Sequence, residues 1–223
     1  MASRLFVSLL AVVAGASPLA LEIDKAQLAR EENVTGYTVT ETYKLRNSRF
    51  SEPAEMVVNV TYAKGAGKTY KVVSRRGPSF LQSAVLDRML KEEAEMSRGQ
   101  MRTEALITSA NYEMKLLGEA VIEGRRCKTV ELTPRRKSPH LLIGKAWVDA
   151  TTYNLIRIEG KPAASISFWA GAPNVIREYT EISGFSFARR SIAVTHGILL
   201  GRSEITVDYS NYDLRLLNGG KTQ

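Results

Sequence analysis

The chain has 223 residues, of which 44% are hydrophobic and 24% are charged, an ordinary globular composition. Its length suits one large domain, and no linker, repeat or low-complexity segment divides it. The net charge of +8 favours anionic partners, such as phospholipid headgroups or an acidic protein face. It does not indicate a nucleic-acid-binding protein, because the aromatic residues are scattered and no basic recognition helix is present. We expect a monomer that binds no nucleic acid.

The N-terminus has the pattern of a signal peptide. Arg4 gives a positive start, residues 5–13 form a short apolar run, and residues 14–16 (AGA) fit a small-x-small cleavage site. The run is too short to cross a bilayer, so it predicts a cleaved leader and not an anchor, with a buried N-terminal helix as the alternative. No cysteine follows it, so a bacterial lipid-attachment site is missing. We therefore expect a signal peptide over residues 1–16 and a single periplasmic domain over residues 17–223.

The first predicted elements are a short helix at residues 21–32 and three strands. From Gly36 the apolar period changes to two, which is typical of a sheet with one apolar and one wet face. The strands lie near residues 37–45, 56–62 and 70–72, with residues 63–68 as a hairpin loop. Their apolar faces contain Tyr37, Val39, Tyr43, Leu45, Met56, Val58, Val60, Tyr62, Tyr70 and Val72.

A longer helix is predicted over residues 79–98. Ser79 and Gln82 match a capping box just after Pro78, and Gly99 is expected to end the helix. An amphipathic helix among strands must bury its apolar stripe against a sheet face. This stripe consists of Leu81, Val85, Leu86, Met89 and Leu90.

Strands return after Ser109. We expect them at residues 112–116, 121–132 with an interruption near Gly124, 145–149, 154–159, 165–169, 175–182, 187–194 and 202–209. The connections are short, and short links cannot make parallel crossovers. The predicted fold class is mainly β with a few helices: a single curled antiparallel sheet of about eleven strands, which is too many for a flat sheet and forms an incomplete barrel. The helix over residues 79–98 is expected to cover its opening as a lid and enclose an apolar cavity.

The sequence is poor in catalytic groups. His140 and His196 are the only histidines, and neither belongs to a zinc-ligand pattern or serves a nucleophile elbow. Residues 65–69 (GAGKT) resemble the end of a phosphate-binding loop, but Tyr62 occupies the position of its first glycine and a strand follows. Cys127 is the only cysteine, so no internal disulfide can form. We interpret it as a small buried side chain, with a reactive thiol or an intermolecular disulfide as the alternative. We expect no enzyme activity, metal or cofactor.

Two sets of residues are candidates for ligand or partner contacts. An anionic headgroup or an acidic partner is expected at the basic residues Arg125, Arg126, Arg135, Arg136 and Lys137, with solvated loops as the alternative. The large aromatic side chains contact a ligand if the cavity is open and pack in the core otherwise. The set expected for the apolar cavity and lid is Tyr37, Val39, Tyr43, Met56, Val58, Val60, Tyr70, Val72, Leu81, Val85, Met89, Tyr112, Met114, Trp147, Phe168 and Trp169.

Five short stretches resemble a known family. They are residues 132–137 (LTPRRK), 144–149 (GKAWVD), 156–160 (IRIEG), 167–169 (SFW) and 205–209 (ITVDY). With the leader, the strands and the lid helix, the chain resembles the LolA/LolB-like lipoprotein-localisation superfamily, and more closely its outer-membrane lipoprotein-sorting proteins. The resemblance implies an incomplete antiparallel barrel closed by helices, with an apolar cavity for acyl chains. It also implies carriage of acylated proteins between the inner and outer membranes, or lipid sensing in an envelope-stress pathway.

Three functional hypotheses follow. The first is a periplasmic carrier that holds lipid or acylated lipoprotein in the cavity, in lipoprotein sorting to the outer membrane. The alternative is an envelope sensor or regulatory scaffold with the same fold, which binds lipid and a partner protein such as an inner- or outer-membrane protein. Both need the same cavity, so the sequence does not separate them. A hydrolase that depends on His196 is the third.

Overall fold

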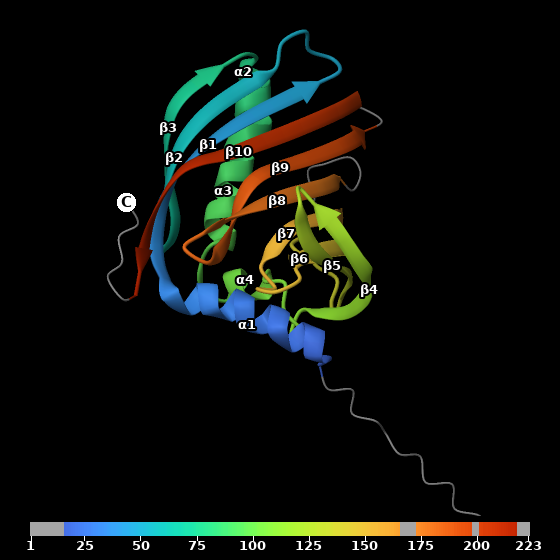
Figure 1. The fold of residues 1–223 in the computed structure, drawn as a ribbon. Helices are drawn as coiled ribbons and strands as arrows, with labels where there is room; N and C mark the ends of the chain where they lie inside the picture. Colours follow the sequence, from blue (N-terminus) through green and yellow to red (C-terminus); the bar gives the residue numbers. More distant parts are fainter. Residues whose placement is uncertain (1–15, 166–172, 198–200, 218–223) are drawn as a thin grey trace, which may run out of the picture.

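The computed structural model describes residues 16–165, 173–197 and 201–217 (Figure 1). In chain order the elements are α1 (Pro18–Asn33), β1 (Val34–Asn47), β2 (Ala54–Ala63), β3 (Gly67–Arg76), α2 (Ser79–Leu81), the π-helical turn η1 (Gln82–Leu86), α3 (Asp87–Met96), α4 (Gly99–Glu104), β4 (Tyr112–Ile122), β5 (Arg125–Pro134), β6 (Leu142–Asp149), β7 (Leu155–Pro162), β8 (Asn174–Ile182), β9 (Phe185–Gly197) and β10 (Gly201–Leu216). The expected signal peptide, except its last residue, lies outside the described residues, as do Phe168 and Trp169.

The ten described strands form one antiparallel sheet in the order β3-β2-β1-β10-β9-β8-β7-β6-β5-β4. Two meanders, β1 to β3 and β4 to β10, are joined through the pairing of β1 with β10. The sheet curls, but its edge strands β3 and β4 are not paired with each other in the described parts of the chain (Figure 1). The expected mainly β fold with a single curled antiparallel sheet and an incomplete barrel is confirmed.

Ten of the expected strands correspond to β1 through β10, and the strand expected at residues 165–169 lies outside the described residues except for Ser165. One expected boundary is wrong, because residues 121 and 122 end β4 and do not begin β5. Glu123 and Gly124 have φ angles of 49° and 79°, and Ile122 pairs with Arg125 across them. Two consecutive positive φ angles are typical of a tight hairpin turn, so the interruption near Gly124 is a chain reversal.

The N-terminal helix α1 runs along one end of the curled sheet (Figure 1). Ser17 caps it, since its hydroxyl accepts a hydrogen bond from the Ala20 amide at 3.3 Å, and Pro18 occupies the first turn, where no amide donor is needed. Ala20 and Ile23 are buried against strands of the second meander. The helix expected at residues 21–32 is therefore present and longer than predicted.

The segment α2–η1–α3, which was predicted to cover the opening as a lid, lies inside the curl of the sheet (Figure 1). The predicted capping box is wrong, because the Gln82 amide nitrogen donates to the carbonyl oxygens of Glu55 at 2.9 Å and Arg76 at 2.6 Å. These are backbone carbonyls of β2 and β3, so Gln82 ties the helix to the sheet and does not cap it. Gly99 does not end the helix either: α3 ends at Met96, and Gly99 begins α4.

Two apolar cores form inside the curled sheet. The first packs the α2–η1–α3 segment against β1, β2, β9 and β10 and includes Met56 and Leu86. The second packs α1 against the strands β4 to β7 and includes Ile23 and Tyr112. Each core therefore belongs to a different part of the sheet. Among the described helices, none is long and apolar enough to cross a membrane.

Candidate ligand-binding cavity

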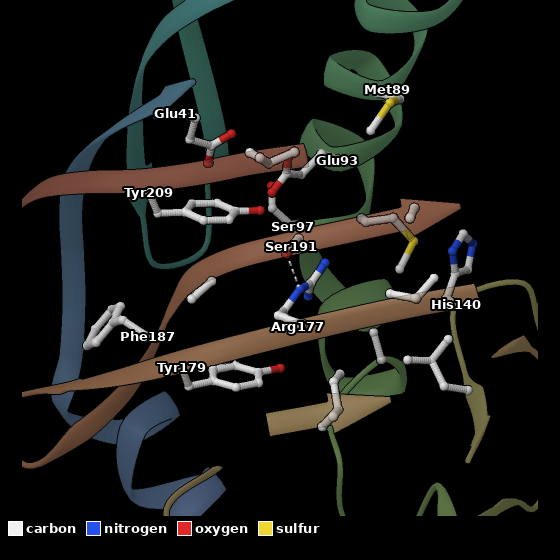
Figure 2. A pocket seen from close by; sticks show the side chains of 18 of the residues that line it. Glu41, Met89, Glu93, Ser97, His140, Arg177, Tyr179, Phe187, Ser191 and Tyr209 are labelled. Atoms are coloured by element: carbon white, nitrogen blue, oxygen red, sulfur yellow. Dashed lines mark hydrogen bonds between the residues drawn. The ribbon is translucent and has the colours of Figure 1, made fainter. Parts of the chain in front are cut away.

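A cavity of about 520 Å³ lies inside the curl, lined by residues of both cores (Figure 2). Most of its mainly apolar wall comes from α1, β1, α3, residues 105–107 after α4, and the strands β7 to β10. The elements β3, α4, β4 and β6 contribute one residue each, and residues 139 and 140 also line the cavity. Small-molecule sites typically have volumes of about 300–1,000 Å³, so the cavity has the size of a ligand site.

Five of the residues expected at an apolar cavity line this one. They are Tyr37, Val39, Tyr43, Met89 and Tyr112. The period of two along β1 turns the first three inward, and Met89 faces them from α3. Tyr112 accepts a hydrogen bond from the Leu142 amide at 3.0 Å, so its hydroxyl is satisfied although the residue is buried. Whether these residues contact a ligand stays a prediction.

Other expected residues belong to the two cores and not to the cavity wall. They are Met56, Val58, Val60, Val72, Leu81, Val85 and Met114. For the residues of β2, β3 and the helices, the reason is that the α2–η1–α3 segment packs on the inner face of the first meander and fills the space above it. Met114 packs instead in the second core. Apolar alternation identifies an inward face, but it does not say whether the space above that face is filled.

Tyr70 and Trp147 do not line this cavity, which corrects the expectation for both, but for different reasons. Tyr70 pairs with the buried Val60 and so shares the inner face, but it lies on the edge strand β3, away from the cavity, and is 43% exposed. Trp147 lies between the buried residues Ala146 and Val148, so strand alternation turns it to the outer face. There the Arg157 guanidinium lies over its ring, 5.6 Å from the ring centre.

The sequence reasoning missed a cluster of charged side chains in the cavity wall. Glu41 of β1, Lys68 of β3 and Glu93 of α3 meet there, with Lys68 Nζ 3.2 Å from Glu41 Oε1 and also bound to Glu93. The Tyr43 hydroxyl lies within hydrogen-bonding distance of both carboxylates, at 3.0 Å from Glu93. The cluster therefore ties α3 to two strands of the first meander.

Mutual interaction shifts the pKa values of this cluster in opposite directions. Burial raises the pKa of the Glu41 carboxyl, and the nearby Glu93 carboxylate raises it further against the effect of Lys68. Burial also acts to raise the pKa of Glu93, but Lys68 outweighs it and holds that pKa below its usual value. Burial lowers the pKa of Lys68, but the Glu93 carboxylate, Tyr37 and Glu41 outweigh this and raise it well above its usual value. Lys68 and Glu93 are therefore the ionised pair, and Glu41 is the carboxyl that binds a proton more readily.

A glycine sets the position of Lys68. Gly67 has a φ of 82°, and a Cβ at this position would lie 2.7 Å from the Ser97 hydroxyl oxygen at the end of α3. The close approach lets the Lys68 amide donate to the same oxygen at 2.6 Å. One sequence signal pointed to this cluster: Glu41 interrupts the inward apolar series of β1 between Val39 and Tyr43. The partners were not predictable, because they come from distant parts of the chain.

A second ionic cluster closes the end of the cavity beside α1. Glu31 accepts two hydrogen bonds from Arg102 of α4, at 2.5 and 2.8 Å, and one from Arg30 at 3.1 Å. The guanidinium of Arg30 also lies over the Phe187 ring, 4.6 Å from its centre. This cluster connects α1, α4 and the sheet.

Arg177 extends into the cavity from the inner face of β8 (Figure 2). Its Nε donates to the Ser191 hydroxyl on the neighbouring strand β9 at 2.9 Å. Burial lowers its pKa, but the surrounding Tyr209, Tyr179 and Glu93 outweigh this and hold the pKa above its usual value. Arg177 therefore remains positively charged inside the cavity.

The basic residues expected to bind an anion do not form one patch. Arg125 and Arg126 begin β5, whereas Arg135, Arg136 and Lys137 follow its end, about 30 Å away for a strand of this length. Several are occupied within the fold. Arg125 pairs with Asp149 at 2.9 Å, Arg135 donates to the Ser109 carbonyl at 2.7 Å, and Arg136 donates to Asn111 at 2.8 Å.

The remaining candidates for chemistry lie apart from one another. His140 lines the cavity but is exposed, and His196 is exposed on β9. Cys127 is buried in β5 with its pKa raised by burial, as expected for a small core side chain. Within the described ranges, no group of three or more His, Cys, Asp or Glu side chains is placed to hold a metal ion.

An unclosed, curled antiparallel sheet around an internal cavity defines this protein as a half barrel. Two solved structures share its fold. A LolA superfamily protein from Nitrosomonas europaea aligns with a TM-score of 0.50 and 13% identity over 91% of this chain and 94% of its own. A domain assigned as an outer membrane lipoprotein-sorting protein from Vibrio parahaemolyticus aligns with a TM-score of 0.51 and 14% identity over 90% and 93%. The chain has a LolA-like fold.

No protein-family model matches the sequence, and no curated protein matches it.

Proposed function

We propose that this protein is a periplasmic carrier that encloses the acyl chains of a lipid or lipoprotein in its cavity and acts in lipoprotein sorting to the outer membrane. The observation that carries the proposal is the apolar wall of the cavity within a LolA-like fold. Val39, Val175, Ile205 and Val207 contribute to this wall from the strands β1, β8 and β10. Each buried methylene of an acyl chain contributes about 0.8 kcal/mol, so apolar burial alone provides strong binding.

Two further observations support the cellular role. The Vibrio parahaemolyticus structure of the same fold is assigned to outer-membrane lipoprotein sorting. The first helix is capped by Ser17, directly after the predicted cleavage site. The intact mass of protein from a periplasmic extract tests the export step, and we expect a mature chain that begins at Ser17.

The test of lipid binding is native mass spectrometry of protein purified from envelope extracts without detergent. We expect a bound mass that corresponds to lipid. Ala193 of β9 lies on the inner face of the sheet between Val175 and Ile205, so Ala193→Trp fills part of the cavity and should abolish the bound mass.

Val194→Trp is the matched control, because Val194 is the next residue of β9 and lies outside the cavity wall. It should retain the lipid. A wild-type protein that never carries lipid, or a blocked variant that carries as much as the control, would overturn the proposal.

We also propose that the protein acts by binding alone. A carrier returns its ligand unchanged, so lipid extracted after prolonged incubation should keep its starting mass. Appearance of a hydrolysed lipid with wild-type protein, and its loss in His140→Ala, would contradict this. His140 is the histidine to change because it lines the cavity.

The sensor or scaffold function has weaker support. Its motivation was the basic residues near the end of β5, but Arg135 and Arg136 hydrogen-bond to the segment between α4 and β4. They are thus used within the fold. The carrier function is the one that the cavity geometry supports best.

A further inference from the structure

Arg177 is a guanidinium fixed in an apolar wall. On β8 it pairs with Ile158 of β7 on one side and Ser191 of β9 on the other. The Ser191 hydroxyl holds Nε at 2.9 Å, so the terminal nitrogens are directed into the cavity (Figure 2). Val175, two residues earlier on β8, faces the cavity beside it. A fixed donor therefore lies next to a wall suited to an acyl chain.

The other cations of the cavity wall have carboxylate partners. Lys68 binds Glu41 and Glu93, and both Arg30 and Arg102 bind Glu31. Arg177 differs from them, since it has no ion pair within 4.0 Å among the described residues. The carboxylate that affects the pKa of Arg177 is Glu93, and Glu93 already binds Lys68 and Tyr43. Arg177 has hydroxyl partners, Ser191 and Tyr179, but no counter-ion among the described residues. A buried charge without a counter-ion is costly, so an anion from outside the chain fits as the missing partner.

We propose that Arg177 binds the acidic head, a carboxylate or a phosphate, of an amphiphile whose acyl chain occupies the cavity. This inference rests on the proposed function and narrows its ligand class to acidic lipids. The planar guanidinium donates two parallel hydrogen bonds to a carboxylate or phosphate, a geometry that an ammonium group does not match. Ser191 orients this fork, and the apolar wall receives the chain.

Isothermal titration calorimetry with ligands of equal chain length tests the inference. Dodecanoate and dodecyl phosphate carry the acidic head, dodecanol lacks the charge, and dodecyltrimethylammonium reverses it. We expect wild-type protein to bind the two acids at least about tenfold more tightly than the alcohol, because a hydrogen bond to a charged group contributes more than one to a neutral group. Acetate and inorganic phosphate alone should not bind measurably, because they lack the chain.

Arg177→Gln should weaken binding of the two acids by about 10- to 100-fold and change dodecanol binding by less than about threefold. Arg177→Lys, which keeps the charge but loses the fork, should fall between the two. Arg190→Gln is the matched control: Arg190 precedes Ser191 on β9 but is exposed and pairs with Asp208 at 3.4 Å. It should bind every ligand as the wild type does.

The outcomes separate this inference from the proposed function. Wild-type protein that binds neither acid nor alcohol overturns both. Equal binding of acid and alcohol overturns the role of Arg177 and leaves the acyl cavity in place, and this result needs no variant to fold. Tight binding of inorganic phosphate that Arg177→Gln removes would define a phosphate site and overturn the amphiphile. Loss of dodecanol binding in Arg177→Gln would overturn the headgroup role, provided that thermal unfolding shows the variant is folded.

Discussion

Replacing Lys68 with methionine is expected to destabilise the protein strongly at neutral pH. The change keeps a long unbranched side chain but removes the ammonium group that lies 3.2 Å from Glu41 and contacts Glu93. Glu41 is 0% exposed, so its carboxylate loses a partner without gaining water. Breaking a buried ion pair on one side costs about 3–5 kcal/mol. For a domain of this size, the unfolding temperature should fall by about 6–20 °C.

The loss of stability in Lys68→Met should depend on pH. Without Lys68, both carboxyls bind protons more tightly in the folded state than in the unfolded chain, where the pKa is near 4.5. A folded-state pKa that is raised contributes stability below the unfolded pKa and loses it as the pH rises. The difference in the free energy of unfolding between wild type and Lys68→Met should therefore be largest at pH 7 and become smaller as the pH approaches 4.5.

Urea unfolding followed by circular dichroism at pH 7 and at pH 4.5 measures both effects. The matched control is Lys44→Met, because Lys44 pairs with Glu55 at 2.6 Å but the two side chains are 38% and 37% exposed. A surface pair of this kind contributes about 0–1 kcal/mol. Equal losses in the two variants, or a loss at Lys68 that does not change with pH, would refute the reasoning that Lys68 compensates buried carboxylates.

Two further predictions test the division between core and cavity. Met56→Ala should lower the free energy of unfolding by about 2–5 kcal/mol, because Met56 is fully buried beneath the helices. The folded variant should still bind dodecanol with near wild-type affinity in calorimetry, and loss of binding would place Met56 at the ligand. Trp147→Ala should change the affinity by no more than the roughly 0.5 kcal/mol typical of surface substitutions, because Trp147 lies on the outer face. A larger loss would contradict that placement.

The fold was largely predictable because each strand carries its own local signal. The alternation of Tyr37, Val39 and Tyr43 identified the inner face of β1, and short polar connections identified antiparallel neighbours. Local sequence patterns gave a wrong prediction where a side chain that fits a local motif makes a long-range contact instead. Gln82 matched a capping pattern, but its amide binds carbonyls of β2 and β3, which come together only in the folded chain.

The site was less predictable because apolar alternation does not distinguish a filled face from an empty one. In β6 the adjacent residues Ala146, Trp147 and Val148 are all apolar, so alternation did not show which of them face inward. The large Trp147 was predicted to line the cavity, but Ala146 and Val148 are the buried residues. The ionic cluster depends on contacts between Glu41, Lys68 and Glu93, which lie on three separate elements. Only Glu41, as a charge in an inward apolar series, was visible in advance.

In the proposed carrier, the first core and the cavity share residues of β1, β9 and β10, but the helices fill only part of the space inside the sheet. The first core packs β2 tightly against α2, η1 and α3, and the ionic cluster around Lys68 fixes α3 over the sheet. Side chains of β8 to β10 line the remaining cavity, and Arg177 lies among them. A charged group on an inner face cannot be covered by apolar packing without losing its hydration, so Arg177 opposes collapse of these strands onto the helices. Under the proposed headgroup role, the side chain that opposes this collapse is also the one that selects the ligand.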